Sequence, residues 1–277
     1  MNIRRRDALL GMAGAMAVAA GGGWWYYRKN ATSLPQSLLL AGSSTMNDLN
    51  RALLDGFAKV HPQVISVLQG GGSLAGLMAL KRGAVDVAAM SRDLTEAEDT
   101  AQTRSHLVAM NEVSIVVHPA SPIKALSRAQ VRAVFTGQIP NWQALGGPNA
   151  PIRVISRTHG ASSLRFVLDE LLNGEEMVLT ARAVARAKQV GAAVAADPFA
   201  IGFVAMSDRV EGPLRRLAID GVLPDRATVL SGRYPLEQPL YLVLHGEPSA
   251  AARDFVAFAL SPKGQAIVAD SHFLPVA

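Results

Sequence analysis

The sequence IRVISRTHGASSLRFVLDELL, residues 152–172, predicts a strand, a short polar loop and a helix, in that order. β-Branched residues dominate its first part, as is usual in strands. Its last part repeats apolar residues along one face of a helix: Leu164, Val167, Leu168, Leu171 and Leu172. Arg157, Gly160, Ser162 and Ser163 lie between the two parts. The start of a helix has unpaired backbone N–H groups and a partial positive charge, so an arginine and hydroxyls there indicate a receptor for an anion.

Two earlier loops repeat this construction. The loop GSST at residues 42–45 and the loop GGGS at residues 70–73 each follow an apolar strand-like run and precede an amphipathic helical pattern. Ligands of open α/β sheets bind beyond the carboxyl ends of the strands, so we expect Ser44, Thr45 and Ser73 to approach the same anion. Each loop alone fits an ordinary helix N-cap, because Ser and Thr are preferred there. The three loops together favour the anion site.

A fourth polar strand end follows the apolar run VDVAAM at residues 85–90. This run leads directly into Ser91 and Arg92, which bring a further hydroxyl and a further positive charge. By the same argument about strand ends, we include both residues in the predicted site.

Strand-like and helix-like patterns alternate through the rest of the chain, which predicts an α/β architecture with largely parallel sheets. Residues 181–196 have a helical composition that ends before Pro198. Ser127, Ser249 and Ser261 each precede a helical pattern and are expected to be N-caps.

The length of 277 residues is sufficient for two compact lobes. The apolar runs at residues 113–117 and 240–244 are predicted to be the two strands that cross between these lobes. Lobe 1 would then hold residues 36–113 plus 237–277, and lobe 2 would hold residues 114–236. This division predicts that the C-terminal helices pack back on the N-terminal lobe.

The composition excludes several classes of function. Cysteine is absent, which excludes disulfides, a thiol nucleophile and thiolate metal sites. The formal net charge is +5, but the five cations and one carboxylate of residues 4–29 account for +4 of it. The nearly neutral remainder has no electrostatic footprint for nucleic acid. The histidines are scattered and no hydrolase, metalloprotease or phosphate-loop motif occurs, so we expect a protein that is not an enzyme and needs no metal or cofactor.

Residues 1–30 have the composition of an export signal. Three arginines at 4–6 precede an apolar run at 8–20, and RRDALLG is typical of the twin-arginine class. Small residues at 17–19 permit cleavage, whereas WWYYRK at 24–29 is typical of an interfacial anchor. We therefore expect an exported, periplasmic protein whose leader is either a cleaved signal peptide or an N-terminal membrane anchor.

The order of several motifs resembles that in the substrate-binding proteins of ABC phosphate importers, over most of the chain beyond the leader. These motifs are GSSTM from 42, GGGSLAG from 70, AVDVAAMSRDL from 84, VFTGQIPNWQALGG from 134, SRTHGASSLRF from 156, AIGFV from 200, GRYPLEQPLYLV from 232 and FALSPKGQAIV from 258. The resemblance implies a two-lobed, hinge-closing type II periplasmic binding fold with one oxyanion in the cleft. It further implies inorganic phosphate or a similar oxyanion as ligand, the membrane permease of an ABC importer as partner, and a monomer.

The resemblance also assigns roles to individual residues. Arg157 corresponds to the anion-binding arginine of the family, while Ala161, Ser162 and Ser163 occupy the positions of its usual Ser-Gly-Thr. Ser163 therefore keeps a hydroxyl and Ala161 lacks one. His159 stands where an acidic residue usually braces the arginine. The predicted ligand-binding residues are Ser44, Thr45, Ser73, Ser91, Arg92, Arg157, Ser162 and Ser163.

Two other functions fit the same fold. Some relatives are described as phosphatases, so His159 with Ser163 would be the candidates for a weak hydrolytic activity. Ala161 and Ser162, which stand where the family usually has serine and glycine, also fit a sensor or scaffold that has lost its ligand.

Selection between phosphate and sulfate requires an acceptor for the proton of hydrogen phosphate. Asp86 and Asp93 are the carboxylates nearest the fourth polar loop, so we expect one of them to give a moderate preference for phosphate. Trp142 lies in a loop-rich stretch and is expected near the mouth of the cleft.

Overall fold

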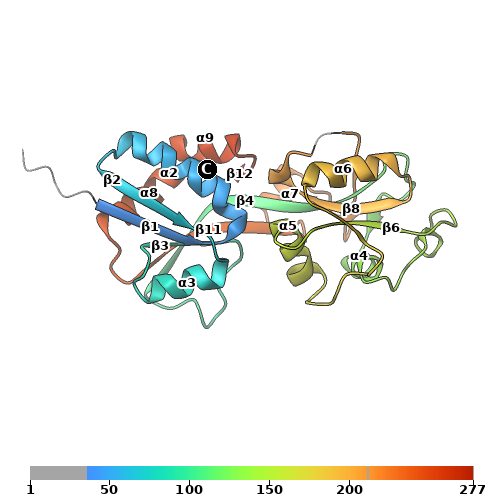
Figure 1. Cartoon of the computed structure of the whole chain (residues 1–277), viewed down its shortest axis with the longest axis horizontal. Helices are drawn as coiled ribbons and strands as arrows, with labels where there is room; N and C mark the ends of the chain where they lie inside the picture. The colour runs from blue at the N-terminus through green and yellow to red at the C-terminus, as the bar shows by residue number, and fades with distance from the viewer. Residues whose placement is uncertain (1–35, 211, 277) are drawn as a thin grey trace, which may run out of the picture.

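The structure is a computed structural model that describes residues 36–210 and 212–276. The predicted leader, residues 1–30, lies outside the described residues. Figure 1 shows two lobes side by side, with strands β4 (Thr103–Val117) and β11 (Glu237–His245) running from one lobe into the other. Within the described ranges, no helix has both the length and the apolar character that crossing a bilayer requires.

Lobe 1 is built on three parallel strands with helices on both faces. β1 lies between β2 and β3 and pairs with both in parallel, as at Leu40, which is opposite Leu68 on one side and Val87 on the other. The elements are β1 (Gln36–Gly42), η1 (Ser44–Met46), α2 (Asn47–Val60), β2 (Val64–Gln69), α3 (Ser73–Lys81), β3 (Val87–Met90), α8 (Ala250–Leu260), α9 (Pro262–Asp270) and β12 (Leu274–Pro275).

Lobe 2 repeats this plan. β6 lies between β8 and β7 and pairs with both in parallel. The elements are β5 (Ala125–Leu126), α4 (Arg128–Phe135), η2 (Trp142–Leu145), β6 (Arg153–Arg157), α5 (Ser162–Phe166), η3 (Val167–Leu171), β7 (Arg182–Val184), α6 (Ala187–Ala196), β8 (Ala200–Ala205), η4 (Met206–Asp208), β9 (Arg215–Arg216), β10 (Ala218–Ile219) and α7 (Arg226–Leu230).

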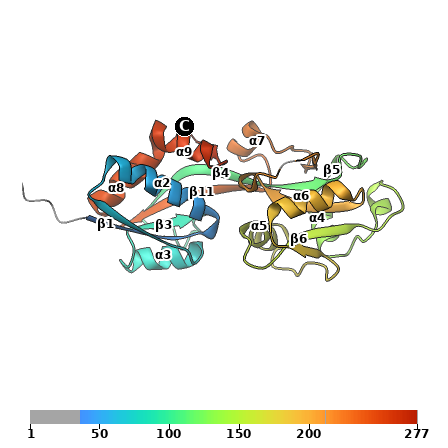
Figure 2. The ribbon, with the colours of Figure 1, turned by 45° about the horizontal axis from the view of Figure 1, so that its top comes forward.

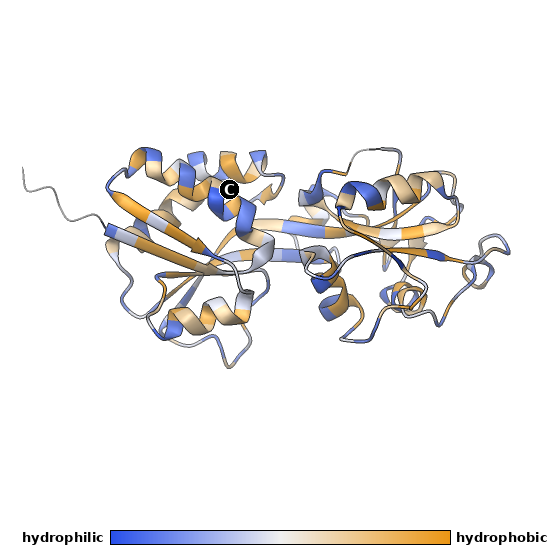
Figure 3. Cartoon of the chain, viewed as in Figure 1, coloured by the Kyte–Doolittle hydropathy of each residue, from blue (hydrophilic) through white to orange (hydrophobic). Residues whose placement is uncertain are grey.

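Each lobe has a hydrophobic core of its own. In lobe 1, Phe57 of α2 packs against Phe255 of α8 with ring centroids 5.5 Å apart, and both side chains are fully buried. The C-terminal helices therefore pack on the N-terminal lobe, as predicted. In lobe 2, Phe135 and Phe203 pack with centroids 5.9 Å apart. Figure 3 shows the apolar residues concentrated in the strands that the helices cover.

β4 and β11, which contain the apolar runs at residues 113–117 and 240–244, join the two lobes. β4 pairs antiparallel with β11 up to Glu112 opposite Glu237, and from Val113 onward it pairs antiparallel with β8. β4 thus belongs to the sheets of both lobes, and both views show it spanning them (Figures 1 and 2). A buried polar layer marks the change of partner, where Asn111 Nδ2 donates to Gln238 Oε1 at 3.1 Å.

Three helix starts were identified correctly from sequence. Ser127 caps α4 by accepting the backbone N–H of Gln130 at 3.1 Å, and Ser249 and Ser261 accept from the first turns of α8 and α9.

The structure corrects three other expectations. The first part of the predicted helix at 181–196 is instead strand β7. Arg182 pairs with Ile155 of β6, so β7 forms the edge strand of the lobe 2 sheet. The helix after the central loop is α-helical only to Phe166 and continues as a π-helical turn, η3. Trp142 is buried in the lobe 2 core, where its Nε1 donates to the carbonyl of Phe199 at 2.9 Å; it does not lie at the mouth of the cleft.

Candidate functional site

The polar strand ends of lobe 1 are tied together, as their shared position at the edge of a parallel sheet predicts. The N–H of Gly72 donates to the carbonyl of Gly42 at 2.9 Å, which links the ends of β2 and β1. The N–H of Ser91 donates to Ser73 Oγ at 3.2 Å, and the two hydroxyl oxygens lie 3.4 Å apart. Hydroxyls from three separate loops therefore share one surface.

Two glycines make this approach possible. A Cβ on Gly42 would lie 2.1 Å from the carbonyl oxygen of Ala89, and its φ of +142° is unfavourable for other residues. A Cβ on Gly76 would lie 2.5 Å from the Cα of Gly42. The contact brings α3, and with it Ser73, directly against the end of β1.

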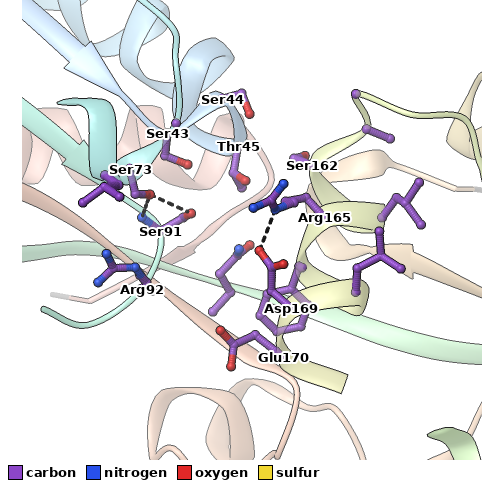
Figure 4. Close-up of a pocket in the computed structure, with 18 of the residues that line it drawn as sticks. Ser43, Ser44, Thr45, Ser73, Ser91, Arg92, Ser162, Arg165, Asp169 and Glu170 are labelled. Carbon is purple, nitrogen blue, oxygen red and sulfur yellow. Dashed lines mark hydrogen bonds and ion pairs between the residues drawn. The ribbon is translucent and has the colours of Figure 1, made fainter. Parts of the chain in front are cut away.

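Lobe 2 contributes the loop between β6 and α5 and the helical turns that follow it. His159 and Ser162 come from the loop and the first residue of α5, and Arg165, Asp169 and Glu170 come from the next turns. Figure 4 shows Arg165 extending toward Thr45 of lobe 1, with a contact to Asp169. Arg165 Nε lies 2.7 Å from Asp169 Oδ2.

These surfaces enclose a cavity of about 620 Å³ between the lobes. A water molecule occupies about 30 Å³ in the liquid, so a single small oxyanion would fill only part of this space. A snug site for such a ligand requires the lobes to approach each other.

Six of the eight predicted residues line this cavity: Ser44, Thr45, Ser73, Ser91, Arg92 and Ser162. Ser43, Gln238, Arg165, Asp169 and Glu170 also line it and were not predicted. The helical periodicity held a signal for the last three, because apolar residues at 164, 167, 168 and 171 leave 165, 169 and 170 off the apolar face. The sequence holds no such signal for Gln238, because this residue reaches the cavity through the path of β11 between the lobes.

Arg157 and Ser163 do not occur among the described residues that line the cavity. Arg157 ends β6, and its side chain is only 13% exposed, with Nη1 3.6 Å from Asp208 Oδ2. Its Nη2 donates to the carbonyl of Ala185 at 3.3 Å, while its Nε has no hydrogen-bond partner among the described residues. Ser163 is buried. Both lie next to lining residues in the chain, and their roles stay predictions.

Arg92 lines the cavity but is already paired. Its Nη1 and Nη2 lie 2.7 and 2.8 Å from the two carboxylate oxygens of Glu98. This bidentate contact lowers the pKa of Glu98 to about 2 and raises the pKa of Arg92. The positive charge of Arg92 is therefore largely balanced within lobe 1.

Neither carboxylate expected to accept a ligand proton reaches the cavity. Asp86 accepts the backbone N–H of Leu39 at 2.8 Å and so supports β1. Asp93 accepts the hydroxyl of Tyr241 at 2.6 Å. Neither residue is among the described lining residues, so the expectation that one of them selects phosphate is not supported by their positions.

The arrangement is suited to binding an anion. Its donors are hydroxyls and guanidinium groups from both lobes. Within residues 36–210 and 212–276, no group of three or more His, Asp or Glu residues could hold a metal ion. Of the two residues considered for hydrolysis, His159 lines the cavity, whereas Ser163 is buried and does not occur among the described lining residues.

A two-lobed α/β protein with polar strand-end loops meeting across one cleft belongs to the class of bilobal solute-binding proteins. Residues 29–263 match the family model of the PBP superfamily domain. The chain therefore belongs to the PBP superfamily.

Curated relatives and solved structures extend this result. The phosphate-binding protein PstS of Bacillus subtilis is 29% identical, over 97% of this chain and 93% of its own length. An ABC-type phosphate transport receptor from Vibrio cholerae shares the fold with a TM-score of 0.80 and 24% identity, over 86% of this chain and 99% of that one. A putative phosphate ABC transporter substrate-binding protein from Clostridium perfringens, solved with bound phosphate, has a TM-score of 0.66 and 27% identity, over 87% of this chain and 100% of that one.

Proposed function

We propose that this chain is an extracytoplasmic solute-binding protein that captures inorganic phosphate between its lobes for an ABC importer. The observation that carries the proposal is the cleft that Ser44, Thr45, Ser73, Ser91, Arg92 and Ser162 line from both lobes. The names of the relatives and the bound phosphate in the C. perfringens protein support it.

Hydroxyl donors fit a tetrahedral oxyanion. The four hydroxyls of lobe 1 and that of Ser162 in lobe 2 can each donate one hydrogen bond to a phosphate oxygen. Each such bond contributes about 1 kcal/mol net, and bonds from charged donors contribute about 1.5–3 kcal/mol. Arg157, which lies close to the lining residues in sequence and pairs with Asp208, would add its charge to this set.

Closure of the lobes is part of the proposal. We assign residues 36–113 plus 237–277 to lobe 1 and residues 114–236 to lobe 2. One boundary of this division lies within β4 and the other lies at the start of β11. Ligand-driven closure requires the anion to interact better with the closed form than with the open one. Donors on both lobes provide that difference.

Calorimetric titration with phosphate tests the function. We expect binding to the wild-type protein, and a loss of about fivefold in affinity for Ser73→Ala and for Ser162→Ala, as one hydrogen bond is removed in each. Ser105→Ala is the matched control, because Ser105 is exposed on β4 and lies outside the cavity lining. Binding that depends on Ser73 but not on Ser162 would contradict capture between the lobes.

Binding without turnover separates this function from the hydrolytic one. The relatives are named as binding proteins and transport receptors. The purified protein should release no product from a phosphomonoester, and steady product formation that is lost in His159→Ala would overturn the assignment.

We infer export through the twin-arginine route from the leader sequence, and delivery of phosphate to a membrane permease by a monomer. Replacing Arg5 and Arg6 by Lys keeps the charge but removes the residue pair that the export receptor recognises. We expect the double variant to remain in the cytoplasm, as shown by cell fractionation. Normal export of this variant would indicate the general secretory route.

A further inference from the structure

A second cavity lies in lobe 2, at the end of β6 that is farther from the cleft. Its volume is about 820 Å³, and its lining comes from the amino end of β6, the start of β7 and the end of α6. α5, which lines the cleft, instead follows the carboxyl end of β6 (Figure 1). Among the described residues, the two cavities share no lining residue. The second cavity is therefore separate from the anion site.

The register of the strands in lobe 2 produces this cavity. β8 pairs with β6 from Arg153 onward, whereas β7 pairs with β6 only from Ile155 onward. The chain just before β7 is bound elsewhere, because the N–H of Val178 donates to the carbonyl of Phe135 at 2.8 Å. The side of β6 that faces β7 thus lacks a neighbouring strand before Ile155, and the cavity lies at this gap.

Most of the cavity wall is apolar and held in place. Pro151 and Ile152 precede β6, and Pro198 and Phe199 lie between α6 and β8. The carbonyl of Phe199 accepts from Trp142 Nε1 at 2.9 Å, and each proline ring fixes the backbone φ at its position. A preformed, mostly apolar cavity of about 300–1,000 Å³ with a few polar groups is typical of a site for a small organic ligand.

The charged groups of the lining leave one positive charge without a partner. Arg153 Nη1 lies 2.8 Å from Asp197 Oδ2, so these two lining residues balance each other. Arg182 also lines the cavity, is exposed, and forms no ion pair with any described residue. A free guanidinium can bind a carboxylate through two parallel hydrogen bonds. The cavity thus combines an apolar wall with a receptor for one carboxylate.

We propose that this cavity is a second ligand site, which binds an apolar organic monocarboxylate. The carboxylate contacts Arg182, and the hydrocarbon part of the ligand packs against Ile152, Pro198 and Phe199. Hydrogen phosphate does not match this site, because it would place polar oxygens against the apolar wall and bring a second negative charge near Asp197. The site does not depend on the proposed capture of phosphate, so either proposal can fail without the other.

The fluorescence of anilinonaphthalenesulfonate, an aromatic anion that emits strongly in apolar surroundings, provides the test. We expect one probe site per chain, with the same affinity in the presence and absence of phosphate. Phenylbutyrate should displace the probe. Phenylbutanol has the same apolar part without the charge, and it should bind at least about tenfold more weakly than phenylbutyrate.

Variants of the lining connect this binding to the cavity. Arg182→Gln should weaken phenylbutyrate at least about fivefold and leave phenylbutanol unchanged within about twofold, which also shows that the variant is folded. Ala196→Glu adds a carboxylate at an exposed position of the lining and should weaken phenylbutyrate by a similar factor. Arg186→Gln is the matched control, because Arg186 is exposed on the same lobe and lies outside both linings; it should change neither affinity.

Three results would overturn the proposal. The first is the absence of probe binding, and the second is displacement of the probe by phosphate, which would locate the probe in the cleft between the lobes. The third is a phenylbutyrate affinity that stays at the wild-type value in both Arg182→Gln and Ala196→Glu.

Discussion

At the scale of single residues, the affinity for the anion should depend strongly on Arg157. Its side chain is only 13% exposed, its Nη1 lies 3.6 Å from Asp208 Oδ2, and its Nε has no hydrogen-bond partner among the described residues. Loss of a charged donor costs about 1.5–3 kcal/mol, so Arg157→Ala should weaken phosphate binding at least about tenfold in calorimetry.

The control for this variant lies on the same strand. Arg153 of β6 is 60% exposed and pairs with Asp197 away from the cleft, so Arg153→Ala should keep the wild-type affinity. If Arg157→Ala also keeps it, the anion's main positive partner is Arg165.

A second residue-scale prediction concerns Gly42. Gly42→Ala should lower the free energy of unfolding by about 1–3 kcal/mol or more, because the new methyl group would lie 2.1 Å from the carbonyl oxygen of Ala89. Gly83 also has a positive φ, +70°, but a Cβ at this position would have no atom within 4 Å. Urea unfolding of Gly83→Ala therefore measures the backbone strain alone, and an equal loss in both variants would show that the contact with Ala89 does not matter.

Residues of the site could be predicted only where the local sequence pattern indicates them. Ser44, Ser73 and Ser162 follow strand-like runs, and the rule that ligands bind beyond strand ends located them. Arg157 is the last residue of β6, but its partner Asp208 belongs to η4, 51 positions later, so the sequence around Arg157 does not indicate this pairing. Asp86 was misplaced because strand alternation alone does not say which face a side chain takes.

At the scale of elements, the crossing strand β4 contains a buried carboxylate. Glu112 is 2% exposed and accepts from Ser114 Oγ at 2.8 Å and from Arg216 Nη1 at 3.1 Å. Burial raises its pKa from about 4.5 to about 7, against the opposing effects of Arg216 and Ser114. The folded protein therefore holds this proton more tightly than the unfolded chain does.

The pH dependence follows from that difference. The contribution of Glu112 to stability is present below pH 4.5 and is lost as the pH rises through about 7. The contribution of Glu112 to the free energy of unfolding falls by on the order of 3 kcal/mol over this range. Glu112→Gln should remove this pH-dependent contribution. The free energy of unfolding of the variant, measured in urea, should therefore rise relative to that of the wild type between pH 5 and pH 8.

Glu98 provides the control for this experiment. Its pKa of about 2 keeps it ionised at both pH values, so the difference between wild type and Glu98→Gln should be the same at pH 5 and pH 8. A constant difference for Glu112→Gln as well would show that Glu112 does not titrate in this range.

Elements with a strong local pattern were predicted correctly, and those that depend on distant partners were not. The serine caps of α4, α8 and α9 are local chemistry and could be identified. β7 has a helical composition, but Arg182 pairs with Ile155, and this non-local contact decides its structure. The π-helical turn η3 changes the spacing of side chains along the helix after Phe166. A regular helical period in the sequence does not predict this change.

At the scale of the whole molecule, the cavity of about 620 Å³ is much larger than one oxyanion. The lobes are joined by β4 and β11, so rotation about these strands is the motion that would narrow it (Figure 2). We expect small-angle scattering to show a smaller radius of gyration in saturating phosphate than in chloride at the same ionic strength. The same radius in both anions would count against closure.

Equilibrium dialysis against radiolabelled phosphate measures whether one phosphate ion is held between the lobes. We expect saturable binding that reaches one phosphate per chain and is displaced by excess unlabelled phosphate. The absence of saturable binding, or a stoichiometry other than one, would contradict it.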